Sequence, residues 1–207
     1  MQINPNNSEV HQFYSYNLSA VGRLDEALAE MRLAQELDPL SIEKIVGVGE
    51  IFYFQRQYDR AIEQYQKALE MDPNSGFTHW AMGRALTEKG LFDKAIVAFQ
   101  KSIPLSGDSP DELVELGRAY ALSGKRSEAQ KVLEDLKSLS ERQYVSPVTL
   151  ASLHAALGER EQAFALLERA YNERDFLLVS LKVEPMFDPF RSDPRFAELV
   201  RRVGLPQ

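Results

Sequence analysis

Leu113-Val114-Glu115-Leu116-Gly117-Arg118-Ala119-Tyr120 is the stretch of the chain that decides its fold. Its glycine, Gly117, recurs at Gly83 and Gly49, each 34 residues earlier. A second ladder with the same step consists of five alanines: Ala27, Ala61, Ala95, Ala129 and Ala163. A period of this length is typical of arrays of helical hairpins, in which each hairpin buries its apolar face only by stacking on its neighbours.

The small residues of both ladders predict where two antiparallel helices cross. Helices that cross closely need a residue without bulk on each partner, which the glycines give on the first helix and the alanines on the second. Proline cannot continue a helix, so Pro39 and Pro73 are expected to close two of the hairpins. Glycine also recurs in the turn within a hairpin, where the second unit has Arg56 instead; the glycines are Gly22, Gly90, Gly124 and Gly158.

These columns resemble the tetratricopeptide repeat family over about residues 8–172. The resemblance implies an all-α fold, a right-handed α-solenoid of helix-turn-helix repeats. We expect the array to occupy residues 1–174, with five repeats at about 8–41, 42–75, 76–109, 110–143 and 144–174. After Ala163 the period fails, and residues 175–207 are expected to form a C-terminal capping segment.

The capping segment is expected to contain three parts. Residues 175–181 are apolar and predict a short helix, whereas the two prolines of 184–189 predict an irregular stretch. Asp193 as N-cap, Pro194 in the first turn and Gly204 at the end predict a last helix, whose apolar stripe closes the solenoid.

The two ends of the sequence suggest a larger protein. Pro5 lies 34 residues before Pro39, as if the chain began in the closing turn of a preceding repeat. Residues 144–206 also resemble the C-terminal ends of bacterial signalling proteins, in which such arrays follow a winged-helix DNA-binding or a serine/threonine-kinase domain. We therefore expect the C-terminal part of a larger bacterial signalling or regulatory protein. A cytoplasmic location is expected, with the extracytoplasmic part of a membrane-anchored regulator as the alternative.

The composition argues against several classes of function. A net charge of −7 disfavours a nucleic-acid surface, and no apolar run approaches the ~20 residues that span a bilayer. The chain has no cysteine, and two of its three histidines, His11 and His79, lie two repeats apart, so no cofactor or metal is expected. No catalytic motif occurs either, and we expect the chain not to be an enzyme.

The concave groove of such an array is lined by the first helix of each repeat. The groove-facing positions include Gln12 and Glu43, and the aromatic and charged side chains typical of binding hot spots are Phe13, Tyr16, Glu50, Tyr53, Phe77, Trp80, Arg84 and Arg118. Arg84 and Arg118 lie one repeat apart, so together they are expected to receive a carboxylate of the partner. In the alternative interpretation Trp80 packs between helices and each arginine pairs with Glu50 or Glu115.

The groove predicts a non-catalytic protein-protein interaction module that binds a protein or peptide. The first alternative is an architectural module without a peptide ligand, which self-associates through its N-terminal repeat. An enzyme is the remaining alternative, for which the sequence offers no motif. The sequence does not name the partner.

Overall fold

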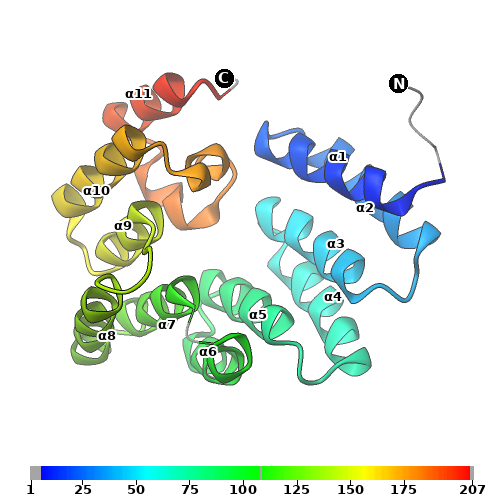
Figure 1. The fold of residues 1–207 in the computed structure, drawn as a ribbon, viewed down its shortest axis with the longest axis horizontal. Coiled ribbons are helices and arrows are strands. Elements are labelled where there is room, and N and C mark those ends of the chain that lie inside the picture. Colours follow the sequence, from blue (N-terminus) through cyan, green and yellow to red (C-terminus); the bar gives the residue numbers. More distant parts are fainter. Residues whose placement is uncertain (1–5, 108, 206–207) are drawn as a thin grey trace.

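The computed structural model describes residues 6–107 and 109–205, and every regular element in these ranges is a helix. Ten α-helices form five antiparallel pairs (Figure 1). The pairs are α1 (Ser8–Ala20) with α2 (Leu24–Leu37), α3 (Ile42–Phe54) with α4 (Tyr58–Met71), α5 (Gly76–Glu88) with α6 (Phe92–Ser106), α7 (Pro110–Leu122) with α8 (Arg126–Leu139), and α9 (Pro147–Ala156) with α10 (Arg160–Glu173). Pro5, on which the expectation of a preceding repeat rests, lies outside the described residues.

The pairs stack into an α-solenoid, which confirms the fold class predicted from the sequence. Within each pair the helices cross at the predicted small residues: all five alanines of the ladder are 0% exposed. In α1 the hydroxyl of Ser15 donates a hydrogen bond to the carbonyl oxygen of Ala27 at 2.6 Å. An ideal Cβ on Gly83 would lie 2.5 Å from Cε1 of Phe99, so only glycine fits at this crossing.

The turns inside the pairs follow the predicted glycine column. Gly22, Gly90, Gly124 and Gly158 all have a φ near +80°, in the left-handed region that glycine enters without strain. Arg56 has the same backbone conformation, with a φ of 61°. Because a side chain in this region costs roughly 1 kcal/mol, a compensating contact is expected at Arg56.

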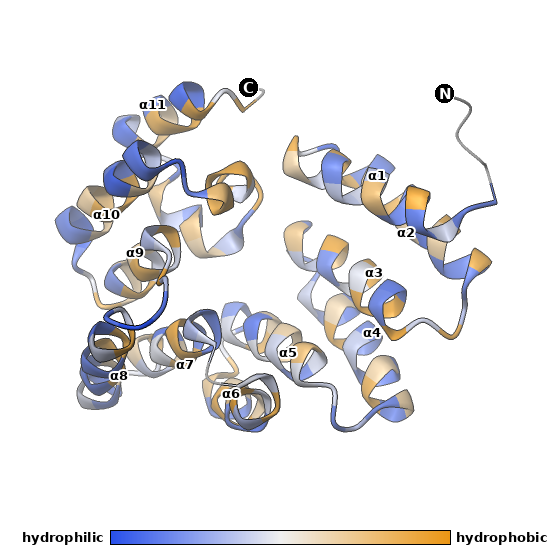
Figure 2. Ribbon diagram, in the orientation of Figure 1, coloured by the Kyte–Doolittle hydropathy of each residue, from blue (hydrophilic) through white to orange (hydrophobic). Residues whose placement is uncertain are grey.

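Most of the helices combine apolar and polar residues, as the mixed colours of Figure 2 show, and they bury apolar side chains in the core. In the first four pairs the first helix packs against the second helix of the pair before it, so α3 contacts α2, α5 contacts α4 and α7 contacts α6. The last pair differs, because α9 packs against α7. The buried side chains form one cluster that runs from Leu18 to Ala119, with further clusters around the last two pairs. The core therefore extends along the array and has no single centre.

Two local differences separate the structure from the expected elements. Helix α6 continues through Pro104 to Ser106, although a proline usually ends or kinks a helix. The proline lies in the final turn, where its missing N–H removes only one hydrogen bond. Residues Pro185–Phe190, expected to be irregular, form a short 3₁₀ helix, η2, which tolerates Pro185 in its first turn.

The rest of the C-terminal segment has the expected helices. Residues Phe176–Ser180 form a first 3₁₀ helix, η1, and Pro194–Val203 form the last helix, α11. Asp193 caps α11 by accepting a hydrogen bond from the backbone N–H of Arg195, and Gly204 ends it. Phe196 and Leu199 bury the apolar stripe of α11 in the C-terminal cluster.

The array curves into an arc, and the segment between α10 and α11 lies inside it (Figure 1). Helix η1 contacts α1, although more than 150 residues of sequence separate them. The C-terminal segment therefore lies within the concave side of the solenoid as well as at its end.

Candidate binding groove

The middle of the concave groove is occupied by the chain itself. Nη2 of Arg84, on α5, donates a hydrogen bond to Oε2 of Glu184 at 2.6 Å. Glu184 directly precedes η2, and both residues are buried. The carboxylate expected on Arg84 is thus present, but it belongs to the same chain.

Arg84 is enclosed by aromatic rings as well as by carboxylates. Its guanidinium carbon lies 4.4 Å from the ring centroid of Tyr53 and 4.6 Å from that of Trp80. Its Nε lies 3.6 Å from Oε1 of Glu115, on α7. Tyr53 is 1% exposed and Arg84 is 5% exposed, so neither presents a surface to a partner in this conformation.

Arg118 is neutralised in the same way. Its Nη1 donates to Glu115 at 2.6 Å and its Nη2 donates to Glu88 at 2.7 Å. We call Arg84, Arg118, Glu88, Glu115 and Glu184 the charge cluster. The expectation that the two arginines together receive a partner's carboxylate is corrected by these contacts, because their terminal nitrogens already pair with three carboxylates of the chain.

Arg56 links the second repeat to the same C-terminal segment. Its guanidinium forms a bidentate ion pair with Asp188 and donates a hydrogen bond to the carbonyl oxygen of Val183 at 2.7 Å. These contacts account for an arginine in a turn position where the other four repeats have glycine. They hold residues 183–188 against the groove from a second side.

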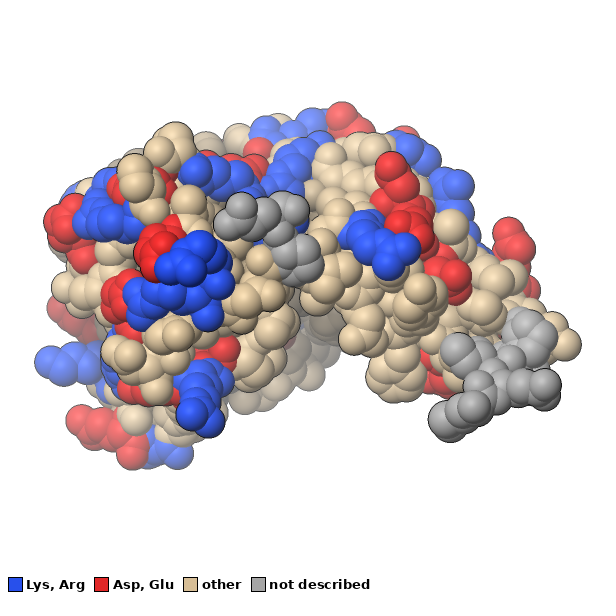
Figure 3. All heavy atoms as spheres, turned by 90° about the horizontal axis from the view of Figure 1, so that it is seen from above, with Lys and Arg blue, Asp and Glu red and all other residues tan. Residues whose placement is uncertain are grey.

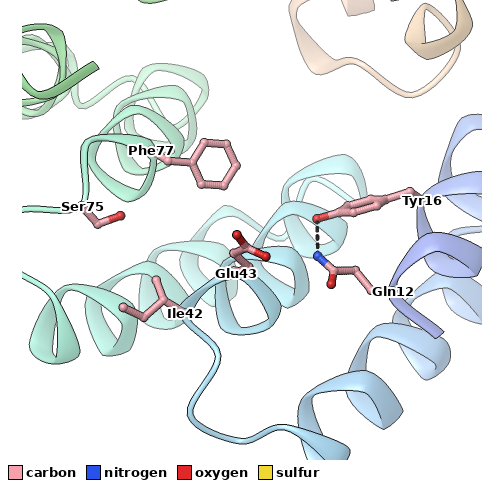
Figure 4. Close-up of a pocket in the computed structure, with 6 residues that line it drawn as sticks. All are labelled: Gln12, Tyr16, Ile42, Glu43, Ser75 and Phe77. Atoms are coloured by element: carbon pink, nitrogen blue, oxygen red, sulfur yellow. Dashed lines mark hydrogen bonds between the residues drawn. The ribbon is translucent and has the colours of Figure 1, made fainter. Parts of the chain in front are cut away.

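The groove stays open nearer the N-terminus, beside the first three repeats. A hollow of about 430 Å³ lies there, and we call it the open hollow. Its lining residues come from α1, from α3 and from the start of α5, and they are Gln12, Tyr16, Ile42, Glu43, Ser75 and Phe77. Figure 4 shows Tyr16 and Phe77 pointing into the hollow from opposite walls, with Glu43 between them.

The open hollow combines apolar rings with hydrogen-bond acceptors. Phe77 is 46% exposed and Tyr16 is 36% exposed, which leaves aromatic surface for a partner. Gln12 is only 8% exposed, and its Oε1 has no hydrogen-bond partner among the described residues. Its Nε2 donates to the hydroxyl oxygen of Tyr16 at 3.4 Å.

Two glutamates of α3 give this part of the groove its charge. Glu43 and Glu50 are seven residues apart, hence on one face of the helix and about 10 Å apart along its axis. Burial raises the pKa of Glu50 to about 7; Arg84 opposes this rise, whereas Glu184 adds to it. Burial, followed by the charge of Glu50 and a smaller effect of Glu43, raises the pKa of Tyr16 to about 12.

The predicted groove residues therefore fall into three groups. Tyr16 and Phe77 line the open hollow, with Glu50 beside Tyr16. Phe13 is 65% exposed and does not line it. The remaining residues belong to the closed part: Tyr53, Trp80, Arg84 and Arg118.

Trp80 connects the two parts of the groove. It stacks on Phe77 with ring centroids 5.6 Å apart and lines a small cavity of about 100 Å³ beside Glu184. Its Nε1 is buried without a hydrogen-bond partner among the described residues. Among the residues that hold the C-terminal segment in the groove, only Arg56 stood out in the sequence, because it replaces glycine in the turn column.

The three histidines lie in separate places within the described ranges. Nδ1 of His11 contacts Glu30, Nε2 of His79 contacts the carbonyl oxygen of Pro73, and Nδ1 of His154 contacts Glu159. Across residues 6–107 and 109–205, no group of three or more potential ligands is placed to hold a metal ion. None of the helices described there is both long and apolar enough to cross a membrane. On the face seen in Figure 3, positive and negative side chains are interspersed.

Comparisons with known proteins agree with this architecture. Residues 49–90 match the family model described as TPR repeat. The solenoid described above continues the same helical pattern over the other pairs, so the chain resembles tetratricopeptide-repeat proteins in its fold. A comparison with curated protein sequences gave no significant match.

Solved structures show the same fold at low sequence identity. TTC0263, a thermophilic TPR protein of Thermus thermophilus, is 18% identical with a TM-score of 0.66, over 94% of this chain and 99% of that one. YrrB, described as a TPR protein with an unusual peptide-binding site, is 21% identical with a TM-score of 0.52, over 86% and 92%. MamA is 20% identical with a TM-score of 0.54, over 78% and 95%.

Proposed function

We propose that this chain is a protein-interaction module that binds an extended segment of a partner protein in the open hollow. The observation that carries this proposal is the hollow itself, because three successive first helices contribute exposed aromatic and polar side chains to one concavity. Concave sites with apolar walls and a few polar groups are where proteins bind ligands. Tetratricopeptide-repeat neighbours that bind peptides, such as YrrB, support the general class.

In the groove, the partner segment is proposed to extend only as far as the part that the chain's own C-terminal segment occupies. Residues 183–188 hold the charge cluster, and Leu181 and Phe187 are fully buried, so these residues are part of the fold. Arg84 and Arg118 therefore stabilise the groove and do not touch the partner. The context we propose is a bacterial signalling or regulatory protein, in the cytoplasm, in which this module supplies partner recognition and no catalysis.

The test compares two variants in a binding assay. A library of random 12-residue peptides displayed on phage is selected against the purified chain, and enriched peptides are measured by fluorescence anisotropy. Phe77→Ala is expected to weaken binding at least tenfold without a change in helical content, because the ring is 46% exposed. Val97→Ala, at a 50% exposed position on α6, is the matched control. Equal affinity of both variants would contradict the proposal.

Self-association is a second candidate, favoured by the exposure of α1. Phe13 occupies the column that holds Gly47 and Ala81 in the next two repeats. Both of these residues are buried, and Gly47 faces Met31 of the preceding pair. Tyr14, beside it, is 49% exposed. If a second copy covers this face, Phe13→Glu converts a concentration-dependent dimer into a monomer in light scattering after size exclusion. A wild-type chain that is monomeric at all concentrations excludes this candidate.

A further inference from the structure

The charges that remain unpaired in the groove are carboxylates. Both arginines of the charge cluster form ion pairs with glutamates of the chain. Lys44, which lies on α3 beside Glu43 in sequence, forms its ion pairs with Glu9 and Asp38 instead. Within residues 6–107 and 109–205, no lysine or arginine lies within ion-pair distance of Glu43 or Glu50.

One neutral acceptor of the hollow also lacks a donor. Oε1 of Gln12 is an acceptor, it is buried, and nothing in the described part of the chain donates to it. Glu43 is exposed and lines the hollow. Glu50 is half-buried and does not line it, but it lies close enough for its charge to help raise the pKa of Tyr16. A ligand that fits these groups must bring hydrogen-bond donors, since an ionised carboxylate only accepts.

The walls of the hollow favour a donor that is positively charged. Lys and Arg side chains carry three and five N–H donors and no acceptor. Their alkyl stems pack on apolar surface such as Ile42, and their charged groups are attracted to the faces of aromatic rings such as Tyr16 and Phe77. The net charge of −7 attracts a cationic partner over longer distances as well.

We propose that the open hollow receives a Lys or Arg side chain of the partner segment, held by Glu43 and Gln12, attracted by the nearby charge of Glu50 and flanked by an apolar residue on Phe77. This inference rests on the proposed function and names the chemistry of its partner. It reverses the expectation from sequence, in which Arg84 and Arg118 select an acidic partner. The two arginines instead hold Glu184, and the carboxylates left over select a cation.

The test is a double-mutant cycle between the chain and a synthetic peptide. The most enriched 12-residue peptide of the phage selection is made in two forms, one with its Arg or Lys and one with citrulline or norleucine in its place. We expect the neutral peptide to bind at least tenfold more weakly to the wild-type chain. We expect the Glu43→Gln, Glu50→Gln double variant to bind both forms equally weakly. Glu63→Gln, at an exposed glutamate on α4, is the control and is expected to behave as wild type.

The outcomes separate the two proposals. If the enriched peptides bind Phe77→Ala more weakly but contain no Lys or Arg, the cationic partner is overturned and the binding site stays in place. The same conclusion follows if their affinity does not change when both glutamates are replaced. If the affinity of the peptides is unchanged by Phe77→Ala, both proposals are overturned. A selection that enriches no peptide counts against both as well.

Discussion

The buried ion pair between Arg84 and Glu184 makes the most quantitative prediction of the structure. The side chains are 6% and 10% exposed, and their charged atoms lie 2.6 Å apart. Arg84→Met leaves Glu184 as a buried carboxylate that has lost the hydrogen bond from Nη2 of Arg84. Removing one partner of a buried pair costs about 3–5 kcal/mol, because the other charge stays desolvated. For a chain of this length this lowers Tm by on the order of 10 °C.

A double variant isolates the interaction energy of the pair from the effects of neighbouring residues. Replacing both residues by methionine removes the uncompensated charge, and replacing a buried ion pair by apolar side chains is often close to neutral. Because Arg84→Met alone costs about 3–5 kcal/mol and the double variant is close to neutral, we expect a coupling energy of at least about 3 kcal/mol in the cycle of single and double variants. Circular dichroism during urea unfolding measures each free energy.

An exposed ion pair supplies the matched control. Arg202 and Glu168 lie 2.8 Å apart on α11 and α10, with side chains 30% and 49% exposed. Their cycle is expected to give less than about 1 kcal/mol. A coupling energy for Arg84 and Glu184 as small as that of the control would refute the placement of the C-terminal segment in the groove.

Three further predictions concern single positions. Gly83→Ala is expected to cost about 1–2 kcal/mol although alanine favours helix, because its Cβ would lie 2.5 Å from the ring of Phe99; urea unfolding shows the sign. Ala95→Leu overpacks a fully buried crossing and is expected to cost about 1–3 kcal/mol in the same assay, with affinity for the selected peptide unchanged in the folded chain. The stability of the Glu50→Gln variant is expected to equal that of the wild type below pH 4.5 and to exceed it above pH 7. The raised pKa means that wild-type stability falls as pH rises through this window, by on the order of 2–3 kcal/mol, and thermal unfolding between pH 4 and 8 checks it. A pH-independent difference would contradict the assignment of that titration to Glu50.

The repeat architecture was predictable because its determinants are local and periodic. Ala27 and the four alanines in register with it are fully buried at helix crossings, and a 34-residue step places them there whatever the surface carries. The turn glycines are equally local, since a positive φ is a property of one residue. Such features are read directly from the spacing.

The path of residues 175–190 was not predictable from the same pattern. This segment has no period, and its position depends on contacts such as Arg84 with Glu184, which are 100 residues apart in sequence. The sequence offered one indirect signal, because Arg56 takes a glycine position at a cost that its contacts with Asp188 and Val183 offset. A short segment without a repeat does not reveal which distant charges it neutralises.

The candidate site was predicted in part for the same reason. Tyr16 and Phe77 follow from the groove-facing positions of the first helices, and both line the open hollow. Trp80 and Arg84 occupy equivalent positions, yet the C-terminal segment covers them, and Tyr53 lies beneath Arg84. Periodicity identifies the face of a helix but not what covers it.

The division of the groove is tested most directly by mapping the selected peptide on the chain. Backbone amide chemical shifts are recorded by NMR while the peptide is added. We expect changes at Gln12, Tyr16, Glu43 and Phe77, around the open hollow, with Glu184 unaffected because it stays on Arg84. Changes confined to the convex helices α4 and α6, or loss of the signals of residues 183–188 as the peptide displaces them, would contradict the account.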